Sequence, residues 1–284
     1  MQPIPDWLSL WRELVEAHAR GRAQAKVDEH PDVWRDRAHT YHETVQRRWA
    51  KPDSSRAFIA ADLERHPGET VLDIGAGTGA WTAFLARVAR HVTALDLSPA
   101  MLNVLRENVA AEGLTNVSII AGGWPEVDVV PHDVVLCSHA LYGVADFAAA
   151  VHKMTAVAQR RCYLLLRVVT PDGVMAQAAQ HIWGQPYDSP NFQVGYNALL
   201  QLGIFANVLL EDTGLWKPWV NASLDEALAD VKRRFDLVND PTHDVFLRDL
   251  LAQHLTEVNG QWVWPSGTRS ALVYWDVEKA HHEP

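Results

Sequence analysis

A regular alternation of strand-like and helix-like segments in the middle of the chain constrains its fold more than any other feature. Five short apolar runs are typical of buried strands, and they occupy residues 70–75, 92–97, 116–123, 132–139 and 162–169. Segments with apolar residues three or four positions apart lie at residues 79–91, 98–113 and 146–160. In the second of these helices Ser98 and Pro99 suit the N-cap and first position, and Gly113 suits the end. The alternation predicts an α/β fold with a doubly wound, mostly parallel sheet.

The two flanks of this core have patterns of their own. Residues 6–65 show three helical periodicities with breaks at "HPD" and "KPD", so residues 1–65 are expected to form a helical cap or lid. Residues 66–284 are expected to form the main domain, in which a Pro/Gly-interrupted insertion at about residues 170–203 is long for a connection. Further strands are expected at 204–212 and 269–277, with amphipathic helices at 223–238 and 243–258.

Charge and cysteine usage narrow the range of partners and compartments. The chain has 284 residues and a net charge of -10, which disfavours a nucleic-acid partner because such partners select basic surfaces. The N-terminus lacks the basic start and apolar stretch of a secretory signal, and no apolar run approaches the roughly 18 residues of a membrane span. We therefore expect a cytoplasmic protein with no membrane partner, in which Cys137 and Cys162 are buried, reduced thiols. The sequence indicates no oligomeric state.

The loop after the first strand carries glycines at alternate positions, in the sequence "VLDIGAGTG" at residues 71–79. A glycine loop between a strand and a helix lets a ligand approach the backbone, and the helix N-terminus favours an anionic group. Gly75, Gly77 and Ala80 fit the dinucleotide pattern G-x-G-x-x-G/A, and Asp96 ends the next strand where it can hold ribose hydroxyls. The glycine spacing alone is therefore compatible with a dinucleotide.

The acid before these glycines favours a different ligand. Asp73 would lie near the pyrophosphate of a dinucleotide and repel it, whereas it would attract the ammonium group of an amino acid. A ligand with ammonium and carboxylate groups suits the loop better, and Gly79 extends the pattern to D-x-G-x-G-x-G. Dinucleotide oxidoreduction remains a formal alternative.

Residues 71–108, "VLDIGAGTGAWTAFLARVARHVTALDLSPAMLNVLREN", strongly resemble the first two motifs of class I S-adenosylmethionine-dependent methyltransferases. The stretch is especially similar to small-molecule enzymes of the ubiquinone and menaquinone biosynthesis type. The resemblance covers roughly residues 66–170, includes "CSHALYGVADFAAAVHKM", and extends to a lid-like "VWRDRAHTYHE" near the N-terminus. It implies a Rossmann-like, seven-stranded sheet with an antiparallel last strand. It also implies S-adenosylmethionine as cofactor, S-adenosylhomocysteine as product, and in-line methyl transfer to a small-molecule acceptor.

The resemblance further implies which residues hold the methionine and ribose parts of the cofactor. Asp73 would receive the ammonium group, and Asp96 would accept both ribose hydroxyls through its two oxygens. Ser138 would lie near the methionine group, with Arg37 and Tyr41 closing from the lid. The backbone of the three glycines would pass against the methionine part of the cofactor; these are Gly75, Gly77 and Gly79.

The adenine end departs from the family pattern. Leu97 and Met101 would pack on the adenine ring, as the resemblance implies. Many members also place an acid after the third strand, whereas this chain has "AGGWPEVD" there. Backbone and stacking contacts, or an acid that reaches in, would then bind adenine. The candidates for these contacts are Gly122, Gly123, Trp124 and Glu126.

His139 and Tyr142 are the candidates for catalysis. Methyl transfer depends mainly on holding the two reacting atoms at about 3 to 3.5 Å in a pocket that excludes water. A base is needed only if the acceptor starts protonated, and His139 follows the fourth strand, where a histidine can take a proton near neutral pH. Tyr142 is its companion. The sequence has no "HExxH" or paired-Cys spacing, so we expect no metal site.

Substrate recognition is expected to come from outside the core, where tryptophans gather. Trp183 and Tyr187, in the insertion, are predicted to line the substrate pocket. Two other readings of the chain stay open. The glycine pair in place of the usual acid suggests a non-catalytic S-adenosylmethionine sensor or scaffold, and a protein substrate is also compatible with the sequence.

Overall fold

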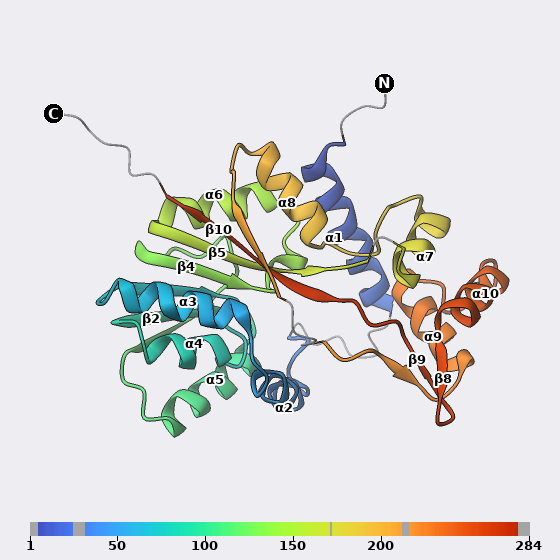
Figure 1. Cartoon of the computed structure of the whole chain (residues 1–284), viewed down its shortest axis with the longest axis horizontal. Helices are drawn as coiled ribbons and strands as arrows, with labels where there is room; N and C mark the ends of the chain where they lie inside the picture. The colour runs from blue at the N-terminus through green and yellow to red at the C-terminus, as the bar shows by residue number, and fades with distance from the viewer. Residues whose placement is uncertain (1–4, 25–31, 171, 212–215, 278–284) are drawn as a thin grey trace.

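The computed structural model describes residues 5–24, 32–170, 172–211 and 216–277. The helix break predicted at His30 and Pro31 lies outside these ranges. Figure 1 shows a central twisted sheet with helices above and below it and a smaller helical part at one end.

A seven-stranded sheet forms the centre of the molecule, in the order β3-β2-β1-β4-β5-β10-β6. The strands are β1 (Thr70–Ile74), β2 (His91–Asp96), β3 (Val117–Ala121), β4 (His132–Ser138), β5 (Ala158–Val168), β6 (Asn207–Leu210) and β10 (Arg269–Asp276). The last strand, β10, is antiparallel to both β5 and β6, and the pairs among β1 to β5 are parallel. This confirms the predicted Rossmann-like sheet with an antiparallel last strand.

Helices cover both faces of the sheet because successive strand residues point to opposite sides. In β4, Val135 and Cys137 belong to the core beneath α6 and α8, whereas Val134 and Leu136 belong to the core beneath α3 and α4. α1 packs outside α6 and α8, and α5 lies beside α4 against β2 and β3 (Figure 1). The bounds are α1 (Trp7–Gln24), α3 (Ser54–Arg65), α4 (Ala80–Ala86), α5 (Pro99–Ala111), α6 (Phe147–Val157) and α8 (Phe192–Gln201).

The helix α2 (Ala38–Trp49) lies beside α5 and over the first strand-to-helix loop. His42 Nδ1 is 3.1 Å from Thr78 Oγ1, and Ser98 Oγ donates to the carboxylate of Asp32 at 2.8 Å. Ser98 is also the N-cap of α5, as the sequence predicts, and accepts from the Met101 amide. These contacts fix α2 at the carboxyl ends of the parallel strands.

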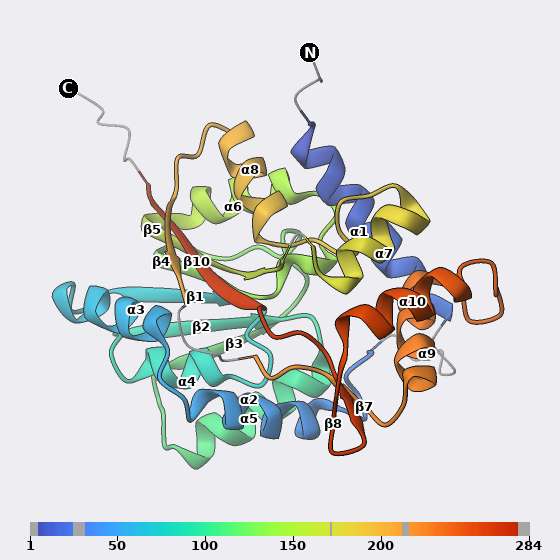
Figure 2. The ribbon, with the colours of Figure 1, turned by 45° about the vertical axis from the view of Figure 1, so that its right-hand side comes forward.

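A second, smaller core lies at one end of the sheet (Figure 2). It joins α7 (Val174–Trp183) from the insertion to α9 (Leu224–Phe235) and α10 (Asp244–His254). A small sheet in the order β7-β9-β8 belongs to this part, with β7 (Val220–Asn221), β8 (Thr256–Val258) and β9 (Gln261–Val263). The prediction of one helix over 243–258 was therefore wrong at its end. The sequence carries a hairpin signal here, the dipeptide Asn259–Gly260. In the structure both residues have the positive φ of a tight two-residue turn.

Three sequence expectations concern features outside the active region. Cys137 and Cys162 are buried and unbonded to each other. Within the described ranges, the structure contains no helix with the length and hydropathy needed to cross a bilayer. The same residues contain no group of three or more His, Cys, Asp or Glu side chains placed to hold a metal ion.

Candidate functional site

The glycine loop after β1 is shaped by close contacts on two sides. The amides of Gly75 and Ala76 both donate to the Leu95 carbonyl, at 2.8 and 2.9 Å. Gly75 has a φ of +68°, and a Cβ built on it would lie 2.2 Å from the Cβ of Ala140, in the segment after β4. Only glycine therefore allows the loop to cross between β2 and the end of β4.

Asp73 lies beneath this loop rather than in its opening. Its carboxylate is 1% exposed and accepts a hydrogen bond of 2.6 Å from Thr82 Oγ1. Burial raises the pKa of Asp73 to about 7, and the negative charge of Asp96 adds to this rise, against the Thr82 hydrogen bond. A cation close to the loop would favour the charged form of Asp73 and offset the cost of burying that charge.

Asp96 ends β2 with both carboxylate oxygens directed at backbone amides. Gly77 N–H donates to one oxygen and Ser98 N–H to the other, each at 2.8 Å. Burial raises the pKa of Asp96, and these two hydrogen bonds oppose the rise. The carboxylate is thereby fixed in orientation, and each oxygen keeps a lone pair for a further donor.

Two cavities meet at Gly75, which lines both of them. The first has a volume of about 580 Å³ and lies between the ends of β2 and β3 and the segment after β4. Its lining includes Leu97, Gly123 and Glu126, and Leu97 is 74% exposed. Trp124 also borders this cavity, but its indole N–H donates to the Ala150 carbonyl, so the ring is held in the core.

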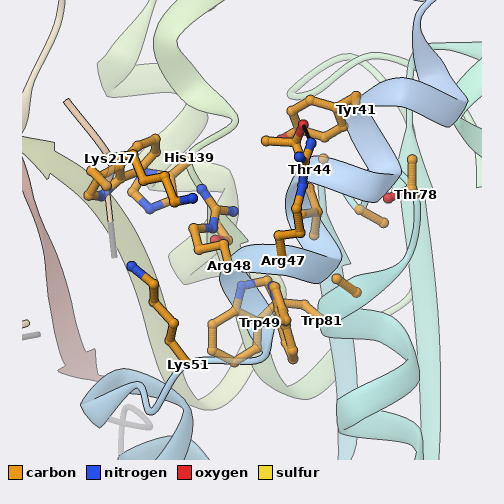
Figure 3. Close-up of a pocket in the computed structure, with 16 residues that line it drawn as sticks. Tyr41, Thr44, Arg47, Arg48, Trp49, Lys51, Thr78, Trp81, His139 and Lys217 are labelled. Atoms are coloured by element: carbon orange, nitrogen blue, oxygen red, sulfur yellow. Dashed lines mark hydrogen bonds between the residues drawn. The ribbon is translucent and has the colours of Figure 1, made fainter. Parts of the chain in front are cut away.

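The second cavity has a volume of about 640 Å³ and lies under α2 on the other side of the loop (Figure 3). Tyr41 and Ser138, both predicted for the cofactor, line it together with His139. The remaining lining residues that carry large or charged side chains are Arg47, Arg48, Trp49, Lys51, Trp81, Trp216 and Lys217. Aromatic rings and cations thus dominate its wall.

His139 and Tyr142 form one hydrogen-bonded unit at the end of β4. His139 Nδ1 is 2.9 Å from the Tyr142 hydroxyl, and His139 Nε2 is 3.1 Å from Ser270 Oγ. The Tyr142 oxygen also accepts from the Arg167 amide at 2.6 Å. Burial, with the nearby charges of Arg48 and Arg167, lowers the pKa of His139 to about 3. Burial raises the pKa of Tyr142 well above its usual value. Both ring nitrogens of His139 are therefore engaged, and the imidazole is neutral.

The structure places four other predicted residues away from these cavities. Arg37 is exposed at the N-cap of α2, and Met101 of α5 is buried against Ala38 of α2. Trp183 packs on Phe235 in the second core, with ring centroids 4.5 Å apart. Tyr187 borders a separate cavity of about 140 Å³ between the two cores. The four residues are Arg37, Met101, Trp183 and Tyr187.

Sequence reasoning missed the cations of the second cavity. Arg47 and Arg48 are the basic residues in the last turn of α2, where positive charge is common because it complements the helix dipole. Lys217 follows β6 and reaches the cavity from a distant part of the sequence. The only signal was the cluster "RRWAK" at residues 47–51 inside an acidic chain.

Comparison with known proteins agrees with this geometry. A family model described as "Methyltransferase domain" matches residues 71–161, which contain the glycine loop, Asp96 and the end of β4. These residues therefore match the methyltransferase domain of that family. The family uses S-adenosylmethionine, so the match decides between the two nucleotides that the glycine spacing left open.

Two curated relatives resemble this methyltransferase domain. Protein-L-isoaspartate O-methyltransferase 1 of Polaromonas sp. is 38% identical over 113 residues, covering 37% of this chain and 48% of that protein. A Methanosarcina mazei protein named "Probable ribosomal RNA small subunit methyltransferase A" is 38% identical over 120 residues, covering 40% of this chain and 43% of that protein. The chain spans less than half the length of either relative.

A solved structure shows the same fold over a larger part of the chain. The YcgJ protein of Bacillus subtilis superposes with a TM-score of 0.53 at 15% sequence identity, covering 80% of this chain and 99% of that one. The likeness supports the class I architecture described above.

Proposed function

We propose that this chain transfers the methyl group of S-adenosylmethionine to a small-molecule acceptor. The observation that carries the proposal is the pair of cavities that meet at Gly75, one beside Asp96 and the other beneath α2. A bound nucleoside in the first would place the reacting group at the boundary with the second, where an acceptor has room.

The residues around the first cavity fit the cofactor. The bare backbone at Gly75 and the fixed carboxylate of Asp96 suit the ribose and methionine parts, and Leu97 offers an exposed apolar platform. Glu126 Oε2 would lie 3.4 Å from a Cβ at Gly123, so an acid reaches the adenine side despite the glycine pair. Asp73 would meet the ammonium group through charge, directly or through water.

When bound, the cofactor supplies an electrophilic methyl group on a sulfonium centre. The protein's part is to hold the acceptor in line and to exclude water. The helix α2 closes the second cavity, and we assign His139 and Tyr142 to positioning, because their mutual hydrogen bond and that to Ser270 fix the imidazole. Proton acceptance by His139 is disfavoured by its burial and by the cations beside it.

A small acceptor is favoured over a macromolecule by the size of the second cavity. Its volume of about 640 Å³ falls within the range of roughly 300 to 1,000 Å³ typical of small-ligand pockets. The net charge of -10 opposes an RNA substrate. A protein acceptor is the second candidate, favoured by the relative named for protein isoaspartate methylation.

A methyl-transfer assay with labelled S-adenosylmethionine tests the proposal. Wild-type protein is incubated with the small-molecule, protein and RNA fractions of a bacterial extract in separate reactions. We expect label in the small-molecule fraction only, and none with Asp96→Ala. Label confined to protein or RNA would contradict the small-molecule acceptor. Cofactor binding without label in any fraction would favour the sensor or scaffold.

A further inference from the structure

The described lining of the second cavity is rich in positively charged side chains. Among the described lining residues there are four cations, and none is acidic. The cations come from the end of α2 and from the segment after β6, and they are Arg47, Arg48, Lys51 and Lys217. This concentration is unusual in a chain whose net charge is -10, so it calls for an anionic occupant.

Other arginines in the described part of the chain are paired with carboxylates. Arg160 lies 2.8 Å from an oxygen of Asp62 and 2.5 Å from one of Glu69, and Arg234 forms a close ion pair with Asp188. Arg48 and Lys217, by contrast, form no ion pair with any carboxylate within the described ranges, and Arg48 is half-buried. The partly buried charge of Arg48 is costly unless a ligand neutralises it, whereas Lys217 is exposed and free to turn toward such a ligand.

The cations and aromatic rings are arranged around His139 (Figure 3). The Arg48 guanidinium lies over the Trp216 ring, 4.9 Å from its centroid, and that ring meets His139 edge-on at 5.5 Å. Trp49 and Trp81 form an edge-to-face pair at 5.3 Å on the opposite wall. A planar molecule between these walls would lie against aromatic surface with cations at its edge.

We propose that the acceptor is an aromatic compound carrying a carboxylate or phosphate group. An anion subsite formed by Arg48 and Lys217 would hold that group, and Trp81 and Trp216 would flank the ring. The proposal rests on the proposed function, since it names the class of acceptor for the same site. The cofactor has a single carboxylate of its own, which one cation satisfies, so further cations remain for the acceptor.

Calorimetry with three matched probes tests the anion subsite without knowledge of the true acceptor. Naphthoate, naphthyl phosphate and the uncharged naphthamide are each titrated into wild-type protein saturated with S-adenosylhomocysteine, which removes the cofactor's carboxylate from the competition. We expect at least one anionic probe to bind about tenfold more tightly than naphthamide, as a charged hydrogen bond predicts. The better of the two anions identifies the group that the subsite selects.

Single variants then locate the subsite. Arg48→Met and Lys217→Met should each weaken binding of the better anion by about tenfold and leave naphthamide unchanged. Lys217→Arg should restore most of the affinity. Arg106→Met, which removes an exposed cation from α5, is the control for net charge and should change neither probe.

Two outcomes would overturn the proposal. One is equal binding, or no binding, of the charged and uncharged probes to protein that binds S-adenosylhomocysteine normally. The other is anion binding that neither Arg48→Met nor Lys217→Met weakens. Failure of S-adenosylhomocysteine itself to bind would instead contradict the proposed function, and the same probes titrated into the protein alone would still decide the anion subsite.

Discussion

The two cavities that meet at Gly75 differ in where their residues come from and in the charge they carry. The cavity beside Asp96 is built from strand ends and loops of the sheet, and its charged groups are acids. The cavity under α2 is built from that helix and the residues just after it, the end of β4 and the segment after β6, and its charged groups are cations.

This difference suggests that the first cavity serves cofactor binding, which methyltransferase domains have in common, and that the second serves the choice of acceptor, which differs between proteins. The first cavity uses backbone and acid positions that the methyltransferase domain provides by its topology, since parallel strands bring their carboxyl ends to one edge. The second cavity is completed by segments outside residues 71–161. Cofactor binding and acceptor choice should therefore respond to different substitutions, and the following experiments test that separation.

The substitution Gly75→Ala should have the largest effect, because Gly75 borders both cavities. The new Cβ would meet Ala140 at 2.2 Å, and the loop would have to move. Displacement of a positioning group by about 1 Å costs on the order of 100-fold in reaction rate, so we expect at least that loss of methyl transfer, together with weaker binding of S-adenosylhomocysteine by calorimetry. Gly113→Ala is the control, since Gly113 has a similar φ of +65° but open space around its Cβ position.

Gly113→Ala should lower the free energy of unfolding by about 1 to 2 kcal/mol, the cost of a left-handed residue with a Cβ, and leave binding intact. Equal binding losses in the two variants would contradict a specific role for the close approach of Gly75 to Ala140.

Asp96→Asn should weaken ligand binding in the first cavity and leave binding in the second cavity unchanged. The amide can accept from only one of the two backbone amides that Asp96 serves. We expect S-adenosylhomocysteine affinity to fall by about 10- to 100-fold, with naphthoate binding to the unliganded protein unchanged. Asp128→Asn, at a fully exposed carboxylate, is the matched control. Parallel losses of both ligands would contradict the separation of the two cavities.

The ionisation of Asp73 should make stability depend on pH. The pKa of Asp73 is about 7 in the folded protein, against 3.8 for an ordinary aspartate, so the folded state binds the extra proton. The resulting stability is present at low pH and is lost as pH rises from about 4 through about 7. Asp73→Asn cannot titrate, so its stability relative to wild type should rise by about 2 kcal/mol between about pH 5.5 and pH 8.

Denaturant unfolding of both proteins at the two pH values measures this difference. Asp73→Asn should also weaken S-adenosylhomocysteine binding, because the ammonium group loses its counter-charge. A stability difference that stays constant with pH would show that Asp73 is not protonated in the folded state.

Tyr142→Phe should have the smallest effect on ligands. It removes the hydroxyl that bonds His139 and accepts from the Arg167 amide, leaving a buried donor unpaired at a cost of about 1 to 3 kcal/mol of stability. S-adenosylhomocysteine affinity should not change, whereas methyl transfer should fall several-fold as His139 loses its orientation. Tyr196→Phe, whose hydroxyl donates to the Ala206 carbonyl, is the control and should leave methyl transfer unchanged.

Much of the first cavity could be predicted from the sequence because its determinants are local. A buried strand followed by glycines defines the loop at Gly75, and Asp96 ends the next strand at a fixed spacing. The same alternation of patterns predicts the parallel strands, and the resemblance to class I methyltransferases implied the seven-stranded sheet with its antiparallel last strand. Leu97 and Gly123 also border the cavity as expected from their places after β2 and β3.

The second cavity could not be predicted in this way because its parts meet only in the folded chain. Arg48 reads as an ordinary basic residue at a helix end, and Lys217 lies in an irregular segment after β6. Trp183 shows the converse error, since an aromatic residue in an insertion suits a pocket as well as a core, and α9 supplies the core. His139 was chosen for its usual pKa, which burial and Arg48 lower.

Titration of S-adenosylhomocysteine into the wild-type protein tests the central claim most directly. If the Gly75 loop and Asp96 form a cofactor site, calorimetry will show one bound molecule per chain with a dissociation constant in the micromolar range, and Asp96→Ala will abolish the signal. The absence of binding to the folded wild-type protein, or binding that Asp96→Ala leaves unchanged, would contradict the account.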